Sequence, residues 1–401
     1  MDGKVWITGV GAVTALGFDF TTIAESLLAG RSAAKLVHDR NPGEELLSPG
    51  CMIDYIPTPT GLDHESFRQL PIVDQASLAC CQTALRDSGW ANRSDGLRVG
   101  LVLGTGGEWL RHWEMASVPG NLECQNGDTL GLLHRTHARL GIEGPRMLVA
   151  AACASGNFAL ALARNWIRQN RVDICIAAGV EMGSPILRAS FKSLRALSRR
   201  IDAPEQASRP FDRGRDGLVM GEGAVAFVLE SDALAQRRGK RPYGEVAGFG
   251  ASSDAYHMII PRADPEPVTR AITKALADAQ IDPSGIDYIN AHATSTPVGD
   301  KAEAIALRRV LGRHTLKTPV SSTKSMTGHL LSAAASIEAL ASLAAIRYQA
   351  LPPTINLDDP DPECELFHVA NRARHANVNV VVSNSFGFGG NNSSLVLKRV
   401  A

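Results

Sequence analysis

Short β-rich runs alternate with helical patterns along the whole chain of 401 residues, and this alternation constrains the fold more than any other feature. The expected strands are residues 4–10, 98–104, 146–152, 173–180, 223–230, 287–293, 318–323 and 377–385. The expected helices are residues 20–29, 75–88, 156–169, 268–279, 301–311 and 329–348. Strands that alternate with helices are typical of parallel sheets covered by helices. The sequence therefore predicts an α/β fold.

One arrangement of strand, turn and small-residue helix occurs twice. In the first half the run MLVAAA leads through Cys153 into an Ala-rich helical pattern, and in the second TPVSST leads through KSMTGH into another. We interpret this as an internal duplication in which small residues let two helix backbones approach closely. The polar stretch 232–245 is the expected join between residues 1–240 and 241–401. Residues 378–400 hold two strand-like runs around a Gly-rich turn, which predicts a hairpin.

Composition argues against several functional classes. Lys and Arg together number 41, as do Asp and Glu, so a net charge of zero gives no electrostatic footprint for nucleic acid or an anionic membrane. The seven cysteines include no Cys-x-x-Cys pair, which indicates neither a disulfide framework nor a structural zinc site. The N-terminal segment lacks signal-peptide features, and glycines interrupt the long apolar runs before they reach transmembrane length. We expect a cytoplasmic protein.

Cys153 stands where a strand-like run ends and a helical pattern begins. It can be a packed core thiol, as many buried cysteines are. It can also be a nucleophile whose thiolate is stabilised, and whose pKa is lowered, by the N–H groups and dipole of the helix N-terminus. Its small neighbours, among them Ala152, Ala154 and Gly156, leave room for a substrate beside the sulfur. This segment alone leaves both interpretations open.

Polar residues after other strands offer partners for a reactive thiol. His292 follows the run DYINA, and Lys324 and His329 lie in a loop and first helical turn after TPVSST. Phe388 stands in a Gly-rich loop whose N–H groups can face an anion. Each has a structural alternative: a hydrogen-bonded histidine, a solvated lysine or a plain hairpin turn.

Taken together and in this order, the segments resemble the elongating, type II β-ketoacyl-acyl-carrier-protein synthases of the thiolase superfamily. The resemblance extends from VWITGVGAVTALG to SNSFGFGGNN and includes ASRPFDRGRDGLVMGEGA, NAHATSTPVGDKAEA and VSSTKSMTGHLLSAA. It implies an α/β, thiolase-like fold with two pseudo-repeated βαβαβαββ halves in a five-layered α-β-α-β-α arrangement. Residues 1–240 would form the half that carries the nucleophilic cysteine. Residues 241–401 would form the half that carries the two histidines and a Gly-rich gating loop.

The resemblance also implies an acyltransferase that performs decarboxylative Claisen condensation in fatty-acid, polyketide or unusual-lipid biosynthesis. Cys153 would accept an acyl chain from a carrier-protein thioester. His292 and His329 would bind the malonyl thioester and promote its decarboxylation. The resulting enolate would attack the acyl-cysteine and give a β-ketoacyl thioester and CO₂.

Further residues receive roles through the same resemblance. The N–H groups of Cys153 and Phe388 would form the oxyanion hole, and Phe388 would also act as a gate. Lys324 would lie near the histidines, with Glu303 as its ion-pair partner. The reaction requires no metal or redox cofactor, and no motif indicates one. The histidines of HRTH, His134 and His137, lack a third ligand in view, which favours a surface helix over a metal site.

The acyl-pocket region departs from the family pattern. The pocket candidates are Gly107, Glu108, Trp109 and Phe191. Glu108 and Trp109 stand where small residues are typical, beside a position that helps to set chain length. Larger residues than usual also stand at Leu187, Arg188 and Lys192. Asn157 and Phe158, just after the nucleophile, differ from the common pattern too. The acyl substrate stays open between housekeeping fatty-acid elongation and a specialised pathway.

The implied partner is an acyl carrier protein, which is acidic, so we expect a small basic docking surface. Arg195, with Arg199 and Arg200, is one candidate, and Arg68 is another. A homodimer is expected, and a heterodimer with a chain-length-factor-like subunit is the alternative assembly.

Two other functions are alternatives to that of a condensing enzyme. A non-catalytic subunit of the chain-length-factor type typically lacks the nucleophile, so the presence of Cys153 with both histidines argues against it. A thiolase would need a second catalytic cysteine near the C-terminus, and SNSFGFGGNN contains none.

Overall fold

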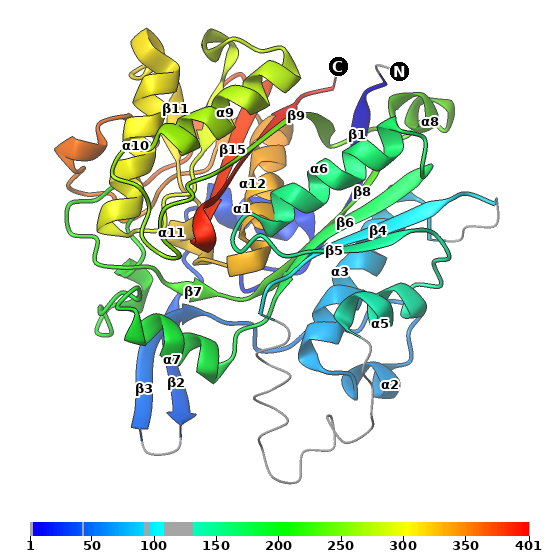
Figure 1. Ribbon diagram of the computed structural model, residues 1–401. Helices are drawn as coiled ribbons and strands as arrows, with labels where there is room; N and C mark the ends of the chain where they lie inside the picture. The colour runs from blue at the N-terminus through cyan, green and yellow to red at the C-terminus, as the bar shows by residue number, and fades with distance from the viewer. Residues whose placement is uncertain (1–2, 42–43, 92–95, 108–130, 401) are drawn as a thin grey trace.

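The computed structural model describes residues 3–41, 44–91, 96–107 and 131–400. Its main feature is a large mixed sheet, in the order β13-β11-β10-β15-β16-β9-β1-β8-β6-β4-β5 (Figure 1). The strands are β1 (Val5–Thr14), β4 (Val99–Gly104), β5 (Arg146–Val149), β6 (Ile174–Glu181), β8 (Gly223–Ser231), β9 (Gly244–Ser253), β10 (Tyr288–Asn290), β11 (Pro319–Ser321), β13 (Phe367–His368), β15 (Val380–Gly387) and β16 (Asn391–Lys398).

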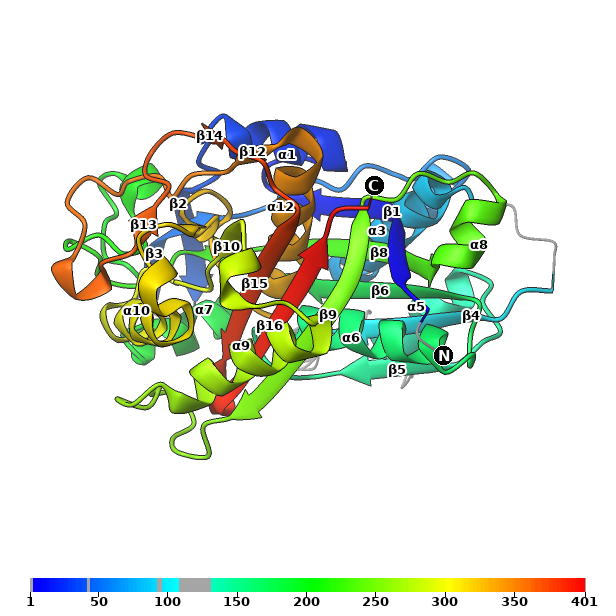
Figure 2. The same cartoon turned by 90° about the horizontal axis from the view of Figure 1, so that it is seen from above.

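The same strand order occurs twice in this sheet. The first half is ordered β5-β4-β6-β8-β1 and the second β11-β10-β15-β16-β9, with β13 as an extra edge strand. In each half the first three strands of that order are parallel. The remaining pairings within each half are antiparallel. The halves join where β1 pairs with β9, with Trp6 opposite Glu245. Figure 2 shows β9, β15 and β16 running obliquely to β4, β6 and β8. The repeated order confirms the predicted duplication, while the division at residue 240 stays a prediction.

Helices fill the positions between the strands. They are α1 (Phe20–Leu28), α2 (His64–Arg68), α3 (Ile72–Ser88), α5 (Leu132–Arg139), α6 (Ser155–Arg168), α7 (Pro185–Ser193), α8 (Asp232–Arg237), α9 (Glu266–Ala279), α10 (Pro297–Leu311), α11 (Lys324–Thr327) and α12 (Ala334–Tyr348). Most expected helices are confirmed within a few residues. Helix α10 begins earlier than expected because Pro297 stands in its first turn, where a missing N–H costs nothing.

The predicted single helix over 329–348 is wrong at its start. Helix α11 ends before Gly328, whose φ of 66° is left-handed, and α12 begins only at Ala334. A side chain at Gly328 would place its Cβ 3.0 Å from the Cys51 sulfur. His329 is extended instead of helical, because its N–H donates to the carbonyl oxygen of Val219 at 2.7 Å.

Three apolar cores separate the layers. Alternate residues of a strand face opposite sides of a sheet, so Leu101 and Leu103 of β4 join the core under α3 and α5. Val102 instead joins the central core around α6 and α12. In the second half Val381 of β15 faces that central core, and Val382 faces the core under α9 and α10. Helices, sheet, helices, sheet and helices therefore follow one another, as the five-layered expectation requires.

The two helices of the central layer come very close. A Cβ added at Gly156 of α6 would lie 2.4 Å from the hydroxyl oxygen of Ser336 and 2.7 Å from its backbone nitrogen in α12. Only a glycine permits this approach without a shift of α12. The expected close contact between two small-residue helices is confirmed.

Smaller elements lie outside the main sheet. Strands β2 (Lys35–Asn41), β3 (Glu44–Cys51) and β7 (Met220–Gly221) form one small sheet, and β12 (Ala350–Leu351) pairs with β14 (Arg374–His375). The expected C-terminal hairpin is present as β15 and β16, joined by the short turn Phe388–Gly390. Within the described ranges, no helix has the length and apolar character to cross a membrane.

Candidate active site

Cys153 lies in a tight turn between β5 and α6. Ala152 has a left-handed φ of 49°, which reverses the chain just after the strand. The N–H groups of Ala154 and Ser155 donate to the carbonyl oxygens of Ala151 and Ala152, both at 3.1 Å. The Ser155 hydroxyl oxygen accepts the N–H of Ala151 at 2.9 Å. The turn thus holds Cys153 in one position, at the end of the sheet where β4, β5 and β6 finish.

The end of β15 supports this turn from the second half of the chain. The Ser385 hydroxyl donates to the carbonyl oxygen of Cys153 at 2.8 Å. A Cβ at Gly387 would lie 2.9 Å from the carbonyl oxygen of Ala151 and 3.0 Å from the nitrogen of Cys153, so the contact requires a glycine. The N–H of the next residue, Phe388, acts to lower the pKa of the Cys153 thiol. The structure thus brings the cysteine and the Gly-rich turn together.

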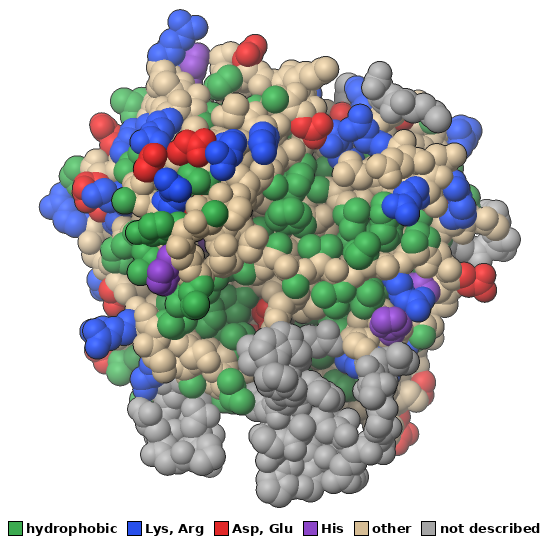
Figure 3. Space-filling view, viewed as in Figure 1, with side chains coloured by type: hydrophobic (Ala, Val, Ile, Leu, Met, Phe, Trp, Pro, Cys, Tyr) green, Lys and Arg blue, Asp and Glu red, His purple; other side chains and the backbone are tan. Residues whose placement is uncertain are grey.

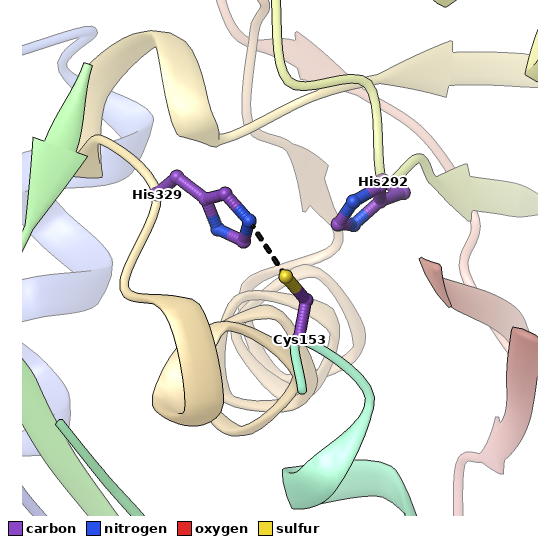
Figure 4. Close-up of side chains that lie close together, drawn as sticks. All are labelled: Cys153, His292 and His329. Atoms are coloured by element: carbon purple, nitrogen blue, oxygen red, sulfur yellow. Dashed lines mark hydrogen bonds between the residues drawn. The ribbon is translucent and has the colours of Figure 1, made fainter. Parts of the chain in front are cut away.

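The two expected histidines meet at the cysteine. Nε2 of His329 lies 3.0 Å from Sγ of Cys153, and Figure 4 shows the sulfur directed between the two imidazole rings. The ring centroids of His292 and His329 are 5.3 Å apart at an interplanar angle of 81°. One atom from each of the three side chains lies within 4.8 Å of the others. Cys153 therefore forms one cluster with two histidines that each lie more than 130 positions further along the sequence.

Backbone contacts hold both histidines in place. His329 lies in an extended segment whose carbonyl oxygen accepts the N–H of Gly221 at 2.9 Å. His292 follows β10, and its N–H donates to Glu303 at 3.0 Å. Glu303 also accepts the N–H of Ala293 at 2.7 Å and the side-chain amide of Asn384 at 3.1 Å. Glu303 is thus fully engaged in positioning the His292 turn.

Lys324 has a different ion-pair partner from the one expected. Its ammonium pairs with the buried carboxylate of Glu338 in α12 and donates to the carbonyl oxygen of His292. The expected pair with Glu303 is wrong, because the N–H groups of the His292 turn and the Asn384 amide already occupy the oxygens of Glu303. Burial raises the pKa of Glu338 to about 7, and the charge of Lys324 acts against that rise.

The sequence could have indicated Glu338. It is the single charged residue in the run SAAASIEALASLAAI, and a charged side chain on an otherwise apolar buried helix needs a partner. What the sequence could not indicate is the distance to Lys324, because the break at Gly328 sets how α11 and α12 face each other.

The site keeps its cysteine and histidines neutral. Burial raises the pKa of the Cys153 thiol to about 12, although Lys324 and the N–H of Phe388 act in the opposite direction. Burial and the charge of Lys324 lower the pKa of His292 and of His329 well below the usual histidine value. The expected lowering of the thiol pKa is therefore wrong. Burial outweighs the helix terminus here, partly because the first N–H groups near α6 are bonded within the turn.

A cavity of about 330 Å³ leads to the three residues. Phe388 and Phe191 stack in its wall, with ring centroids 5.5 Å apart. Thr294, Thr296 and the expected docking residue Arg195 also line the cavity. A substrate thus has a path from the protein surface to the thiol.

Several predicted pocket residues lie elsewhere. Gly107 is not in the cavity wall, and a Cβ there would lie 2.5 Å from the buried carboxylate of Glu181. Glu108 and Trp109 lie outside the described residues. Of the four candidates, Phe191 lines the cavity.

The residues just after the nucleophile point away from the cavity. The Asn157 amide donates to the hydroxyl of Ser393 in β16 at 3.1 Å. Phe158 packs against Phe249 of β9, with ring centroids 5.1 Å apart. Neither lines the cavity. The expectation that they bear on the acyl chain finds no support in these contacts.

The expected docking residues lie in separate elements. Arg195 is exposed, directly after α7, and Arg199 and Arg200 follow in the same loop. The Arg199 N–H donates to Asp216, and the Arg200 side chain donates to the carbonyl oxygen of Gly214 at 2.8 Å. Arg68 is exposed in the short helix α2 and does not line the cavity.

The sequence suggested one place where a metal could be considered, the histidine pair of HRTH, and the structure adds a second group of residues. His137 is buried in α5, and its Nε2 lies 3.0 Å from the carbonyl oxygen of Gly144, while His134 is exposed. These two histidines do not converge on a ligand site. Cys153, His292 and His329 do offer atoms that zinc binds. However, the buried charge of Lys324 acts on all three residues and opposes a dication there.

Family comparisons agree with the architecture. Residues 2–235 match the model for the beta-ketoacyl synthase N-terminal domain, and residues 243–358 match that for the C-terminal domain. A 3-oxoacyl-[acyl-carrier-protein] synthase 2 of Coxiella burnetii is 39% identical, over 99% of each chain. The oxytetracycline polyketide beta-ketoacyl synthase 1 of Streptomyces rimosus is 38% identical, over 98% of this chain and 96% of that one.

Solved structures give the same result. A beta-ketoacyl synthase from Burkholderia phymatum superposes with a TM-score of 0.90 at 33% identity, over the whole of both chains. The ishigamide ketosynthase/chain length factor gives a TM-score of 0.87 at 30% identity, again over both chains. A type II polyketide ketosynthase, in complex with its acyl-carrier protein and bound to the hexaketide, gives 0.86 at 29% with the same full coverage.

Proposed function

The chain belongs to the β-ketoacyl synthase family of acyl-transferring enzymes, and we propose that it condenses an acyl group on Cys153 with malonyl-acyl-carrier protein. The observation that carries this proposal is the meeting of Cys153, His292 and His329 at the end of one cavity. The nucleophile comes from the predicted half 1–240, and the histidines come from the predicted half 241–401. The products are a β-ketoacyl-carrier protein and CO₂.

Acyl transfer to Cys153 is the first step. The thiol is neutral at rest, so it must lose its proton as the sulfur attacks the thioester carbonyl. Nε2 of His329, at 3.0 Å, is the nearest acceptor for that proton. The N–H of Phe388 and that of Cys153 would stabilise the oxyanion that forms. A carbon–sulfur bond to Cys153 forms, and the carrier thiol leaves with a proton.

Decarboxylation of the malonyl group is the second step. Loss of CO₂ leaves negative charge on the oxygen of an enolate, which neutral imidazole N–H groups can stabilise by hydrogen bonding. His292 and His329 suit this role because burial and Lys324 keep both neutral. The enolate carbon then attacks the acyl carbonyl, the bond to Cys153 breaks, and the released thiolate takes up one proton.

Phe388 would act as the gate to the acyl chain. Its ring packs with Phe191 in an apolar cluster that also contains Leu197, Leu218, Met220 and Leu331. Phe191, Leu218 and Phe388 line the cavity at Cys153, so an opening of this stack would admit an acyl chain to the cluster. Phe388 lies in the three-residue turn Phe388–Gly390, where Gly389 and Gly390 have left-handed φ values and permit such a movement.

An acyl carrier protein would dock at the cavity mouth. The carrier's arm must reach Cys153 through the cavity, so the carrier surface must lie at its rim, where Arg195 is exposed. A relative of known structure was solved with its acyl-carrier protein, which supports a partner of this class. An Arg195→Glu variant should bind the carrier protein more weakly and with less salt dependence. Unchanged binding would remove Arg195 from the docking surface.

Assembly as a homodimer is part of the same proposal. Strand β5 ends the main sheet with β4 as its one neighbour among the described residues, and its Met147 and Leu148 side chains are 45% and 39% exposed. Figure 3 shows hydrophobic side chains gathered over α6 and β5. An exposed edge strand with apolar residues is a ready pairing surface for another chain. A cytoplasmic location is expected too, since the six described cysteines are free thiols.

A heterodimer with a chain-length-factor-like subunit would use the same edge. A structural relative was solved as a ketosynthase/chain length factor, which supports this alternative assembly. Size-exclusion chromatography with light scattering of the isolated chain distinguishes the two: a stable dimer supports self-pairing, and a monomer supports a missing partner.

The reaction itself is tested by CO₂ release and product mass. Wild-type protein with acyl- and malonyl-carrier protein should give CO₂ and a β-ketoacyl-carrier protein in equal amounts. A His329→Ala variant should lower the rate of CO₂ release by about 10²–10³-fold, the cost of one oxyanion donor. No CO₂ and no product with any acyl donor would overturn the proposal.

A further inference from the structure

His257 lines the cavity that leads to Cys153, although the mechanism above gives it no role. It lies in the loop that follows β9 and is exposed to the solvent that enters the cavity. Ala255, the second residue after β9, has a left-handed φ of 45°. A titratable ring thus stands in the wall of the substrate path.

Two backbone groups fix which nitrogen of this ring carries the proton. Nδ1 of His257 accepts the N–H of Ile259 at 3.0 Å and that of Ile260 at 3.1 Å. An acceptor of two N–H groups cannot itself be protonated, so the neutral ring carries its proton on Nε2. Within the part of the chain that the structure describes, Nε2 has no hydrogen-bond partner. The ring nitrogen that remains available to a ligand in the cavity, Nε2, is therefore a hydrogen-bond donor.

The loop is also tied to the turn that closes over Cys153. The N–H of Gly389 donates to the carbonyl oxygen of Met258 at 2.7 Å, and the N–H of Asp254 donates to that of Gly390 at 2.9 Å. The Asn392 amide donates to the Asp254 carboxylate at 2.7 Å. His257 therefore occupies a defined position relative to Phe388, instead of moving freely at the surface.

The cavity has complementary polar groups elsewhere in its wall. The hydroxyl oxygens of Thr294 and Thr296 lie 3.1 Å apart and can each donate and accept. The arm that links an acyl group to a carrier protein is linear and contains amides, which present both N–H donors and carbonyl acceptors. A fixed N–H on the wall is suited to the carbonyl oxygen of such an amide.

We propose that His257 is a positioning residue whose Nε2–H donates a hydrogen bond to an amide carbonyl oxygen of the carrier-linked thioester arm. The bond would hold the arm along the cavity and set how far the thioester reaches toward Cys153. This inference rests on the proposed function, because it assigns a contact to the substrate of that reaction. It adds a recognition element for the arm and leaves the acyl chain unconstrained.

Three variants of His257 separate the two nitrogens. In His257→Asn the side-chain oxygen replaces Nδ1 as the acceptor for Ile259 and Ile260, and the Nε2 donor is lost. In His257→Gln the amide N–H₂ lies near the former Nε2 and the Nδ1 acceptor is lost. His257→Ala removes both. The readout is the rate of Cys153 acylation, followed by mass spectrometry.

Two acyl donors reveal whether the arm is recognised. One is an acyl thioester of pantetheine, which has the amides, and the other is the same acyl thioester of 2-mercaptoethanol, which has none. His257→Asn should lower the rate with the pantetheine thioester by about 3–10-fold, the worth of one hydrogen bond, and leave the other rate unchanged. His257→Gln should recover part of the rate that His257→Ala loses with the pantetheine thioester.

Two outcomes would overturn the assignment. An equal loss with both thioesters in His257→Asn would mean that the ring only supports the loop. No loss with either would mean that the arm does not contact Nε2. Failure of the proposed function looks different, because the wild-type protein would then accept an acyl group from neither thioester.

Discussion

The two halves of the chain use the same position of a repeated topology in opposite ways. After β5 the first half makes a left-handed turn and presents one uncharged nucleophile, Cys153. After β11 the second half makes a short helix with the buried Lys324, breaks at Gly328, and then presents His329. The duplicated fold thus provides two equivalent corners, the segments that follow β5 and β11. The first corner carries the group that holds the acyl chain, and the second carries the groups that stabilise charge.

The difference explains why both halves are required. Among the described residues Cys153 forms no ion pair, and burial raises the pKa of its thiol and keeps it protonated. Burial and the charge of Lys324, which pairs with Glu338, lower the pKa of both histidines and keep them neutral. Neither corner can perform condensation alone. The two meet because α6 and α12, which follow these corners, pack against each other at Gly156.

Removing the nucleophile should separate condensation from malonyl decarboxylation most completely. Cys153→Ala leaves no group to carry the acyl chain, so condensation should be abolished. Malonyl decarboxylation should continue, because both histidines and the Lys324–Glu338 pair belong to the other half. Parallel assays of β-ketoacyl product and of CO₂ release check this. Loss of both activities in a folded variant would contradict the division between the halves.

Breaking the buried ion pair should destabilise the second corner strongly. Lys324→Met leaves Glu338 in the core without its partner, at a cost of about 3–5 kcal/mol in the free energy of unfolding. The double variant Lys324→Met/Glu338→Leu should regain most of that loss, because neither charge remains. Urea denaturation of the three proteins measures it. A single variant as stable as the wild type would show that the pair does not hold α11 to α12.

The pH dependence of thiol alkylation tests whether the first corner activates its cysteine. With a thiol pKa of about 12, the thiolate fraction rises about tenfold for each pH unit below that value. The rate of iodoacetamide reaction at Cys153 should therefore rise about 100-fold from pH 7 to pH 9, with no plateau. Peptide mapping after timed quenching gives the rate. A plateau near pH 8 would mean that the helix terminus lowers the pKa after all.

The contact between the two central helices should give the smallest effect. Gly156→Ala places a methyl group 2.4 Å from the Ser336 oxygen, and relief of the clash should cost about 1–3 kcal/mol of stability. The double variant Gly156→Ala/Ser336→Gly removes the hydroxyl but leaves the Ser336 backbone nitrogen 2.7 Å from the added Cβ, so it should recover only part of the loss. Urea denaturation of both variants measures this, and a Gly156→Ala protein as stable as the wild type would contradict the close approach of α6 and α12.

Much of the site followed from the sequence because its residues stand where strands end. Cys153 follows β5, His292 follows β10 and His329 comes soon after β11, so a parallel sheet in each half carries them to one edge. The Gly-rich loop could be assigned to the same place because it joins the last two strands. The positions at strand ends marked the candidates, and the resemblance to β-ketoacyl synthases implied which of them meet.

The remaining features depend on quantities that a linear pattern does not contain. The partner of Lys324 depends on which carboxylate still has free oxygens once Glu303 has bound the His292 turn. The thiol pKa depends on the balance between burial, which raises it, and the helix terminus, which lowers it. Burial is a property of the packed protein. The positions of Asn157 and Phe158 depend on the rotation of α6, which turns both toward β9 and β16.

Mass spectrometry of the acylated protein tests the central claim most directly. The wild-type chain is incubated with an acyl-carrier protein, digested and mapped for the acyl mass at each cysteine. The account predicts a single acyl group on Cys153, with the other six cysteines unmodified. An unmodified Cys153, or an acyl group on another cysteine that persists in Cys153→Ala, would contradict it.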